Sequence, residues 1–485
     1  MPLLKALVRH IKQKPIPFHM PGHKMGVGVA KRFGNLMKTD PFSLDLTELP
    51  GLDDLHNPTG PIREAQIRAA ALFGAQETFF LINGTTVGIH ASILAVCKSG
   101  DEIVLPRDVH RSVIGACILA GVWPRFLNAR LDQDFFIAYP PTALEVAEAL
   151  RKYPAAKAVF QIYPTYYGLV GDLTGVAKIA HSHSIPLIVD EAHGAHFILS
   201  EQLPPTAIES GADLSIQSTH KTLGAFTQAS MLHLNGSLID RNEVSRQLSL
   251  LQTTSPSYLL MASLDAATGH METAGRALMD KVIRISKRTR AKIDRIPEVK
   301  CLGTELVDHG GVIAVDPTKL YISFKGLGIT GYQVAETLVR KYKIQVELSD
   351  NFCILCMLSI GNCAGDAEAL VDAIREIAVT NLQLKLDNMF TGIKNIPIPD
   401  LVMTPRDAWF SSKAPVPIKD AVGRVSAETI ATYPPGIPIV CPGEVISAET
   451  VELIGMFKAE KPCFHGPADP NLNFITVVVD SKSST

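Results

Sequence analysis

Short apolar runs alternate with segments of helical periodicity along the first half of the chain. Residues 61–73 predict a helix, because apolar side chains recur at helical spacing and Gly74 follows as a stop signal. Further helices are expected at 84–97, 109–120 and 176–181, and short strands at 78–82, 102–105, 158–162, 187–189 and 214–217. Strands separated by helices indicate the α/β class, with a mainly parallel sheet covered on both faces.

The pattern changes after residue 258. A long helical stretch, rich in Lys and Arg, is expected to run to residue 296. Beyond it, strands are expected at 311–315, 321–324, 344–348 and 352–358, with a helix at 331–341. This mixture indicates a smaller α+β domain. Proline is frequent between 396 and 442 while apolar residues persist, so we expect loops packed on a scaffold there.

Composition is compatible with an enzyme of more than one domain. The chain has 485 residues, 46% hydrophobic and 19% charged, with a net charge of −2. With no long basic tract, no nucleic-acid partner is expected. No apolar run reaches the ~18 residues of a membrane span, and the first 15 residues lack the apolar core of a signal peptide. We therefore expect no membrane partner and a cytoplasmic location.

Eight cysteines are scattered along the chain, and two of them, Cys353 and Cys356, form a CxxC pair. The pair lies in an apolar run and has no second CxxC nearby. Buried thiols on a strand are therefore favoured over a zinc or redox site, and no metal is expected.

Two polar segments that follow strands carry the chemistry. Asp190 ends one apolar run, and Lys221 follows another in the string Ser218-Thr219-His220-Lys221. A pyridoxal 5'-phosphate (PLP) site needs a lysine that forms a Schiff base with the aldehyde and a carboxylate that keeps the ring nitrogen protonated. Ser218 and His220 could bind the phosphate. Each segment alone is weak evidence, but their order on α/β elements predicts a PLP enzyme of the aspartate aminotransferase fold type I.

Other polar residues follow strands and are candidates for the same crevice. Thr85 and Thr86 open a helix whose free N–H groups suit a phosphate, although an ordinary helix cap is the alternative. His110 could stack on the PLP ring or be a surface histidine. His193 could bind the phenolic oxygen of PLP or be a buried core histidine.

At this point the chain resembles the ornithine/lysine/arginine decarboxylases of PLP fold type I, in the short form without an N-terminal wing domain. The likeness covers nearly the whole chain. It rests on these motifs: Pro17-Phe18-His19-Met20-Pro21-Gly22-His23-Lys24, Asn83-Gly84-Thr85-Thr86, Asp190-Glu191-Ala192-His193, Ser218-Thr219-His220-Lys221, Thr253-Thr254-Ser255-Pro256-Ser257-Tyr258 and Tyr433-Pro434-Pro435-Gly436-Ile437-Pro438-Ile439-Val440-Cys441-Pro442-Gly443-Glu444. The first and last are much more specific to this family than to PLP enzymes at large.

The resemblance implies roles for individual residues. Lys221 would carry the Schiff base, Asp190 would pair with the ring nitrogen, and His110 would stack on the ring. The phosphate would be held by Thr85, Thr86, Ser218 and His220. Thr254 and Ser255 would reach the PLP site of a partner subunit, which makes a homodimer the smallest active unit, and Glu444 would lie near the cationic end of the substrate. His193 stands where longer members often have an aromatic residue, so its role stays open.

The same resemblance implies a domain layout. An N-terminal arm would span 1–59, the large PLP-binding domain 60–275, a linker helix with the small α+β domain 276–390, and a C-terminal subdomain 391–485. The expected reaction is decarboxylation of a basic amino acid, arginine first and then lysine or ornithine, to the amine and CO2.

Two alternatives remain open. The string from Asp190 to Gly194 also resembles the α-oxoamine synthases, which join an amino acid to an acyl-CoA on the same fold. A PLP-binding protein without turnover is the other alternative. The choice among arginine, lysine and ornithine is not fixed by these motifs, and neither is the oligomer beyond a dimer.

Overall fold

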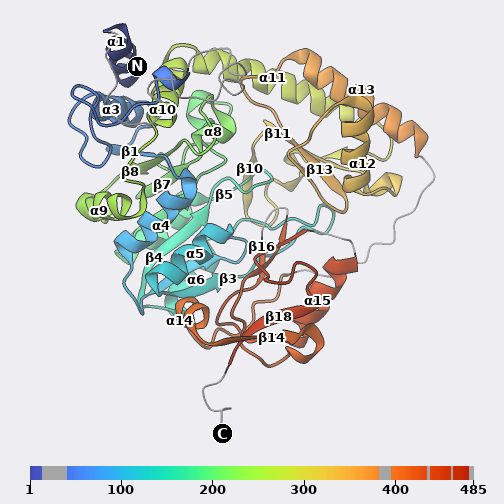
Figure 1. The fold of residues 1–485 in the computed structure, drawn as a ribbon. Coiled ribbons are helices and arrows are strands. Elements are labelled where there is room, and N and C mark those ends of the chain that lie inside the picture. Colours follow the sequence, from blue (N-terminus) through green and yellow to red (C-terminus); the bar gives the residue numbers. More distant parts are fainter. Residues whose placement is uncertain (14–40, 382–394, 434–436, 460–462, 480–485) are drawn as a thin grey trace. The chain divides into compact units, whose positions relative to one another are not determined.

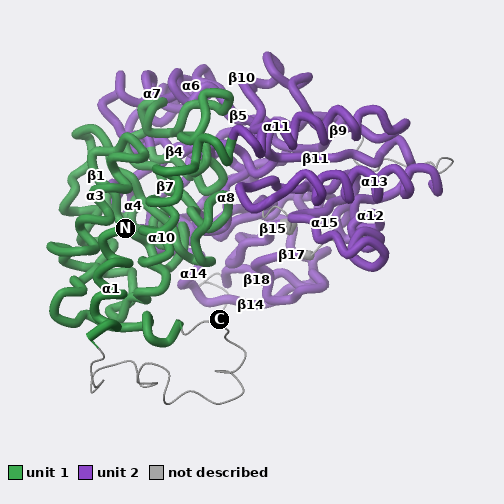
Figure 2. Tube along the Cα trace, turned by 90° about the horizontal axis from the view of Figure 1, so that it is seen from above, with its two compact units in different colours: residues 1–95, 188–279 green, residues 96–187, 280–485 purple. Residues whose placement is uncertain are grey.

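The computed structural model describes residues 1–13, 41–381, 395–433, 437–459 and 463–479. The motif from Pro17 to Lys24 lies outside these residues, and so do Pro434 to Gly436. The described chain forms two compact units, one of residues 1–95 and 188–279 and the other of residues 96–187 and 280–485 (Figure 2). The first is called unit 1 and the second unit 2.

Unit 1 contains four short strands in the order β1-β8-β7-β6. Their bounds are β1 Glu77–Leu81, β6 Leu187–Asp190, β7 Leu214–Gln217 and β8 Ser230–Leu234. All residues of these strands are buried, the polar ones included, as expected of a sheet that is covered on both faces. β6 and β7 are parallel, whereas β8 is antiparallel to both of its neighbours, so the sheet is mixed.

Helices of unit 1 lie on this sheet and on one another (Figure 1). They are α1 Pro2–Lys12, α3 Pro61–Phe73, α4 Gly84–Val96, α8 Thr219–Thr222, α9 Arg241–Leu251 and α10 Tyr258–His270. The prediction for α3 is confirmed to the residue, and Gly74 ends it with a φ of 67°. Gly88 lets α4 approach closely, because a Cβ there would meet Leu81 Cδ1 at 2.6 Å and Ile216 Cγ2 at 2.7 Å.

Unit 2 begins with three parallel strands in the order β4-β2-β3. Their bounds are β2 Glu102–Pro106, β3 Trp123–Leu127 and β4 Ala156–Ile162. The helices that connect and follow them are α5 Arg111–Ala120, α6 Ala143–Lys152 and α7 Leu173–Ser182. Each predicted strand of this part is found within two residues of its expected ends, and β3 and α6 were not expected.

The middle of unit 2 is the small α+β part expected from the sequence. A four-stranded antiparallel sheet has the order β12-β13-β11-β9. Its strands are β9 Lys300–Cys301, β11 Lys319–Ser323, β12 Leu348–Ser349 and β13 Cys353–Met357, and β10 Val312–Val315 pairs instead with β5 Leu169–Gly171. The strand expected at 344–348 is wrong for most of its length, because only Leu348 of that run lies in a strand.

Helices cover this small sheet and share a core with it (Figure 1). They are α11 Arg276–Ile293, α12 Gly331–Thr337 and α13 Ala364–Thr380. The long helical stretch expected from 258 is confirmed, since a π-helical turn at Met271–Gly275 joins α10 to α11.

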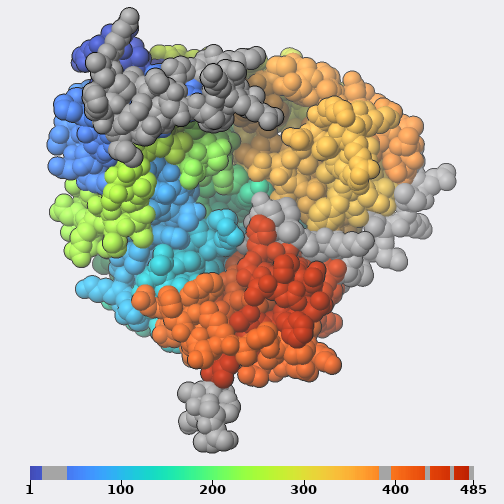
Figure 3. Space-filling model, in the orientation of Figure 1, coloured from blue at the N-terminus to red at the C-terminus, as the bar shows by residue number. Residues whose placement is uncertain are grey.

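The C-terminal part of unit 2 has its own apolar core. It contains α14 Pro405–Phe410, α15 Ala448–Ala459 and the strands β14 Lys413–Pro417, β15 Ile430–Tyr433, β16 Ile437–Val440, β17 Cys463–His465 and β18 Phe474–Val478. These residues, orange to red, lie together in Figure 3. The expectation of loops between 396 and 442 is therefore wrong only in part. Irregular segments alternate there with α14, β14, β15 and β16; β14 pairs with β18, and β15 lies between β16 and β17.

Within the described ranges, none of the helices combines the length and apolar character that crossing a bilayer requires.

Candidate active site

Lys221 and His193 meet at the ends of two neighbouring strands of unit 1. Lys221 lies in the short helix α8, which follows β7, and His193 comes three residues after the last residue of β6. Lys221 Nζ is 2.9 Å from His193 Nε2. At this distance the imidazole of His193 can form a hydrogen bond with the amine of Lys221 and can accept a proton from it.

Asp190 is the last residue of β6 and is 7% exposed. Its Oδ1 accepts a hydrogen bond from the Ala192 amide at 3.0 Å. Burial raises the pKa of this carboxyl, although the positive charge of Lys221 and the Ala192 amide act in the other direction. A cation beside Asp190 would favour the carboxylate and lower the pKa again. The position therefore fits a protonated pyridine ring.

The start of α4 is a candidate phosphate cradle. Gly84 opens the helix with a φ of 73°, and an added Cβ there would meet nothing within 4 Å. The buried Thr85 hydroxyl contacts the Ser218 hydroxyl and lies 3.1 Å from Ser230 Oγ. Thr86 is exposed at the same helix end. The Gly84 amide donates to the Gln228 carbonyl at 3.0 Å, so the amides that follow it in the first turn of this 13-residue helix are the ones that suit a phosphate.

Two further hydroxyls near Lys221 lack a partner. The side-chain oxygens of Thr219 and Thr222 in α8 are buried and have no hydrogen-bond partner among the described residues. Buried polar atoms are normally satisfied, so these orphans are consistent with a polar group that binds next to α8. Together with Asp190, Lys221 and the cradle, the residues present fit PLP.

His220 is held by the backbone. Its Nδ1 lies 3.0 Å from the Ala229 carbonyl oxygen, which only accepts, so Nδ1 carries a proton and donates it. Burial lowers the pKa of this imidazole, the Ala229 contact opposes that effect and Lys221 adds to it. A phosphate near Nε2 would raise the pKa again and favour the doubly protonated ring.

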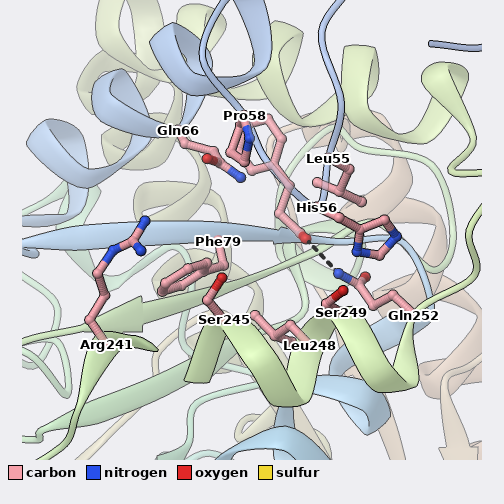
Figure 4. Close-up of a pocket in the computed structure, with 11 residues that line it drawn as sticks. Leu55, His56, Pro58, Gln66, Phe79, Arg241, Ser245, Leu248, Ser249 and Gln252 are labelled. Atoms are coloured by element: carbon pink, nitrogen blue, oxygen red, sulfur yellow. Dashed lines mark hydrogen bonds between the residues drawn. The ribbon is translucent and has the colours of Figure 1, made fainter. Parts of the chain in front are cut away.

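Gln252 ties the segment with Thr254 and Ser255 to strand β1 (Figure 4). Its buried amide donates to the Phe80 carbonyl at 3.3 Å and accepts from the Ile82 amide at 2.9 Å. A cavity of about 20 Å³ beside it has room for about one water molecule. Thr254 and Ser255 are exposed, so their side chains are available to another molecule.

His110 lies in unit 2 and caps helix α5. Its Nδ1 accepts from the Ser112 amide at 3.2 Å and lies 2.8 Å from the Ser112 hydroxyl. The side chain is exposed. Stacking of His110 on a ring held by Lys221 stays a prediction.

Glu444, also in unit 2, is fully buried and paired with Arg107, which is fully buried too. The Glu444 Oε1–Arg107 Nη1 distance is 2.5 Å and the Oε2–Nη2 distance is 2.9 Å. The Cys441 amide also donates to Oε2 at 2.7 Å. Sequence reasoning missed this ion pair. The signal was an arginine placed directly after an apolar strand, because a buried arginine requires an acid.

Glu191 is a second residue that sequence reasoning missed. It follows Asp190 and is fully buried. Its carboxyl accepts from Ser215 Oγ at 2.5 Å, Gln217 Nε2 at 2.9 Å and the Ala207 amide at 2.8 Å. Burial raises its pKa to about 7, and the three hydrogen bonds oppose that shift. It therefore links the strand ends that carry Asp190 and Ser218.

The CxxC pair lies on β13, as expected. Cys353 is buried and Cys356 is half-buried, and burial raises the pKa of both thiols. Both cysteines are free, which makes them strand thiols in a packed domain. The described residues contain no group of three or more metal-binding side chains.

Comparisons with known proteins identify the family of this chain. Residues 1–366 match the model of the Orn/Lys/Arg decarboxylase major domain, and residues 386–465 match the C-terminal domain of the same family. The arginine decarboxylase of Bacillus subtilis is 39% identical over 482 residues, which cover 99% of this chain and 98% of the relative. The lysine decarboxylase of Hafnia alvei is 26% identical and aligns with 93% of this chain and 73% of its own length.

Solved structures show the fold. Lysine decarboxylase A from Pseudomonas aeruginosa matches with a TM-score of 0.86 at 23% identity, covering 99% of this chain and 80% of that protein. A serine palmitoyltransferase from Sphingomonas wittichii, on the same fold type, matches with a TM-score of 0.51 at 16% identity over 67% of this chain. The PLP fold type I prediction is confirmed, and the chain belongs to the Orn/Lys/Arg decarboxylase family.

Proposed function

We propose that this protein is a PLP-dependent decarboxylase of a basic amino acid, with arginine as the favoured substrate. The observation that carries the proposal is the contact of Lys221 with His193 beside the buried Asp190, at adjoining strand ends. Its support is the family match over both domains and the 39% identity to arginine decarboxylases.

The cofactor would be held by residues already named. Thr85, Thr86, Ser218 and His220 would bind the phosphate, and Asp190 would face the ring nitrogen. His110 would stack on the ring, and Lys221 would hold the aldehyde carbon. When bound, PLP supplies an electron-accepting ring conjugated to the substrate amine, which lets the bond to the carboxyl group break.

The chain's own residues then act on charge and protons. The Asp190 carboxylate would keep a proton on the ring nitrogen of bound PLP, because a buried negative charge stabilises a neighbouring cation strongly. Lys221 Nζ and His193 Nε2 are 2.9 Å apart, so a proton can pass between them. This pair would deliver a proton to the substrate Cα after CO2 has left.

We further propose a homodimer as the smallest active unit and a cytoplasmic location. The exposed Thr254 and Ser255 would complete the site of the partner subunit. The reaction on arginine would give agmatine, a precursor for polyamine synthesis. The same residues would give cadaverine from lysine or putrescine from ornithine.

The test is turnover of the pure protein with each basic amino acid. Comparison of kcat/KM for arginine, lysine and ornithine, followed by CO2 release, identifies the substrate. We expect arginine to be preferred. Condensation of an amino acid with an acyl-CoA would support the oxoamine synthase alternative, whereas PLP binding without any turnover would support a non-catalytic protein.

A further inference from the structure

The carboxylate of Glu444 is already engaged by the buried guanidinium of Arg107. Three donors already engage the carboxylate: two from the guanidinium and one from the Cys441 amide. Neither side chain has any exposed surface. A cationic substrate end would have to approach a carboxylate whose charge Arg107 already balances, and the guanidinium would repel it. This geometry indicates that Glu444 holds the Arg107 side chain in place and does not bind the substrate cation itself.

Glu444 is anchored in the C-terminal part of the chain. Its backbone carbonyl accepts from the Ser426 amide at 2.8 Å, and its amide donates to the Cys441 carbonyl at 3.2 Å. Arg107 also donates through Nη2 to the Ile439 carbonyl at 2.8 Å, on strand β16. Strand β16 and the turn that follows it therefore hold both Glu444 and a second acceptor for the Arg107 guanidinium.

Arg107 stands three residues before His110. Its backbone amide donates to the Leu127 carbonyl at 3.0 Å, and its guanidinium lies 4.7 Å from the centre of the Phe126 ring. Val109 is fully buried, and His110 is the cap residue of α5. The segment between the end of β2 and the start of α5 therefore has little conformational freedom as long as the Arg107 side chain stays in place.

We propose that Glu444 is a positioning residue that acts through Arg107 on the segment ending at His110. The C-terminal domain would thus set the angle of the imidazole that faces the PLP ring. This inference rests on the proposed function in one respect, namely that His110 contacts PLP. It differs from the expectation drawn from the sequence that Glu444 itself binds the substrate cation.

The test uses Glu444→Gln and Arg107→Lys, which preserve size, in the wild-type and His110→Ala backgrounds. We expect each single change to lower kcat about 10- to 100-fold, because a displaced group near the reacting atoms has effects of that size, with KM for arginine within about 3-fold. Each should also alter the visible absorption of bound PLP. In the His110→Ala background, either change should lower kcat by less than about a further 2-fold, because the effects of residues that act through one another are not additive.

A wild-type kcat with a raised KM in Glu444→Gln would overturn the proposal and return Glu444 to the substrate site. Full additivity with His110→Ala, in kcat and in the PLP spectrum, would also overturn it. Glu428→Gln is the matched control: Glu428 is a buried carboxylate of the same domain that binds the Ala468 and Thr476 amides, so its loss should leave the spectrum unchanged.

Two further measurements keep the test decisive. If wild-type protein binds PLP without releasing CO2, the proposed function fails. The positioning role is then still decided by whether the changes in the PLP absorption spectrum of the single variants add up in the double variants with His110→Ala. If a single variant does not fold, the Arg107→Met/Glu444→Met protein removes both buried charges, since paired apolar replacements are tolerated better than one unpaired charge. Its PLP spectrum should match that of His110→Ala, and a wild-type spectrum would overturn the proposal.

Discussion

Glu191→Gln should change how the stability of the protein depends on pH. The pKa of the Glu191 carboxyl is about 7 in the folded chain, against an ordinary value of 4.5, because burial disfavours the charged form. Between these two values the folded chain holds a proton that the unfolded chain has lost. The stability contributed by the protonated carboxyl is therefore fully present below about pH 4.5 and is lost as the pH rises through about 7.

The size of the effect follows from the two pKa values. One pH unit corresponds to about 1.4 kcal/mol, so the full change is about 3 kcal/mol. The amide introduced by Glu191→Gln stays neutral at every pH and keeps an oxygen for the Ala207 amide. We therefore expect wild-type protein to lose up to about 3 kcal/mol relative to Glu191→Gln between about pH 4.5 and pH 8.

Urea unfolding of the two proteins at several pH values, at equal PLP and protein concentration, measures this difference. Glu452→Gln, which removes an exposed carboxylate from helix α15, provides the reference. Parallel curves for wild-type and Glu191→Gln would refute the reasoning, and so would a wild-type protein that gains stability relative to Glu191→Gln as the pH rises.

Three further substitutions test the site and its packing. Lys221→Ala should abolish the visible absorption of covalently held PLP and almost all turnover; an adduct reducible by borohydride at wild-type stoichiometry would point to another lysine. Asp190→Asn keeps volume but removes the charge, so kcat should fall about 10²–10³-fold while PLP still binds, and near-normal kcat would contradict the role. Gly88→Ala should destabilise by about 1–3 kcal/mol in thermal unfolding, because its Cβ would clash with two buried side chains. Gly455→Ala, where a Cβ meets nothing within 4 Å, is the helical control and should not destabilise.

Much of the α/β core could be predicted from the sequence because its local signals agree. The apolar run 187–189 gives the buried strand β6, and Gly74 stops α3. β8 was not expected from the sequence, because Ser230 and His233 interrupt its apolar residues. Its antiparallel pairing with β1 and β7 could not be predicted either, since a strand buried on both faces shows no pattern that depends on the pairing direction.

The C-terminal strands were missed because proline was given too much weight. Pro438 lies in β16, which among the described residues stands at the end of the strand order β16-β15-β17 and is therefore an edge strand. An edge strand tolerates proline, since one side of it needs no N–H donor. Proline frequency alone therefore does not distinguish a loop from the edge of a sheet.

For the site, the sequence predicted which residue types follow the strands. It did not predict which of these residues contact one another, because those contacts form only in the folded chain. The Lys221–His193 contact joins residues 28 positions apart, and the Arg107–Glu444 pair joins residues 337 positions apart. No local pattern specifies such pairs. Burial was the missing information, because a carboxylate with no exposed surface needs a partner and an exposed one does not.

The most direct test of the central claim is the fate of arginine labelled at its carboxyl carbon, turned over in D2O by the PLP-loaded protein. The account predicts that the label leaves as CO2 and that each agmatine formed carries one deuterium at the carbon that bore the carboxyl group. Retention of the label in the product, or no label release from arginine, lysine or ornithine by protein that holds PLP on Lys221, would contradict it.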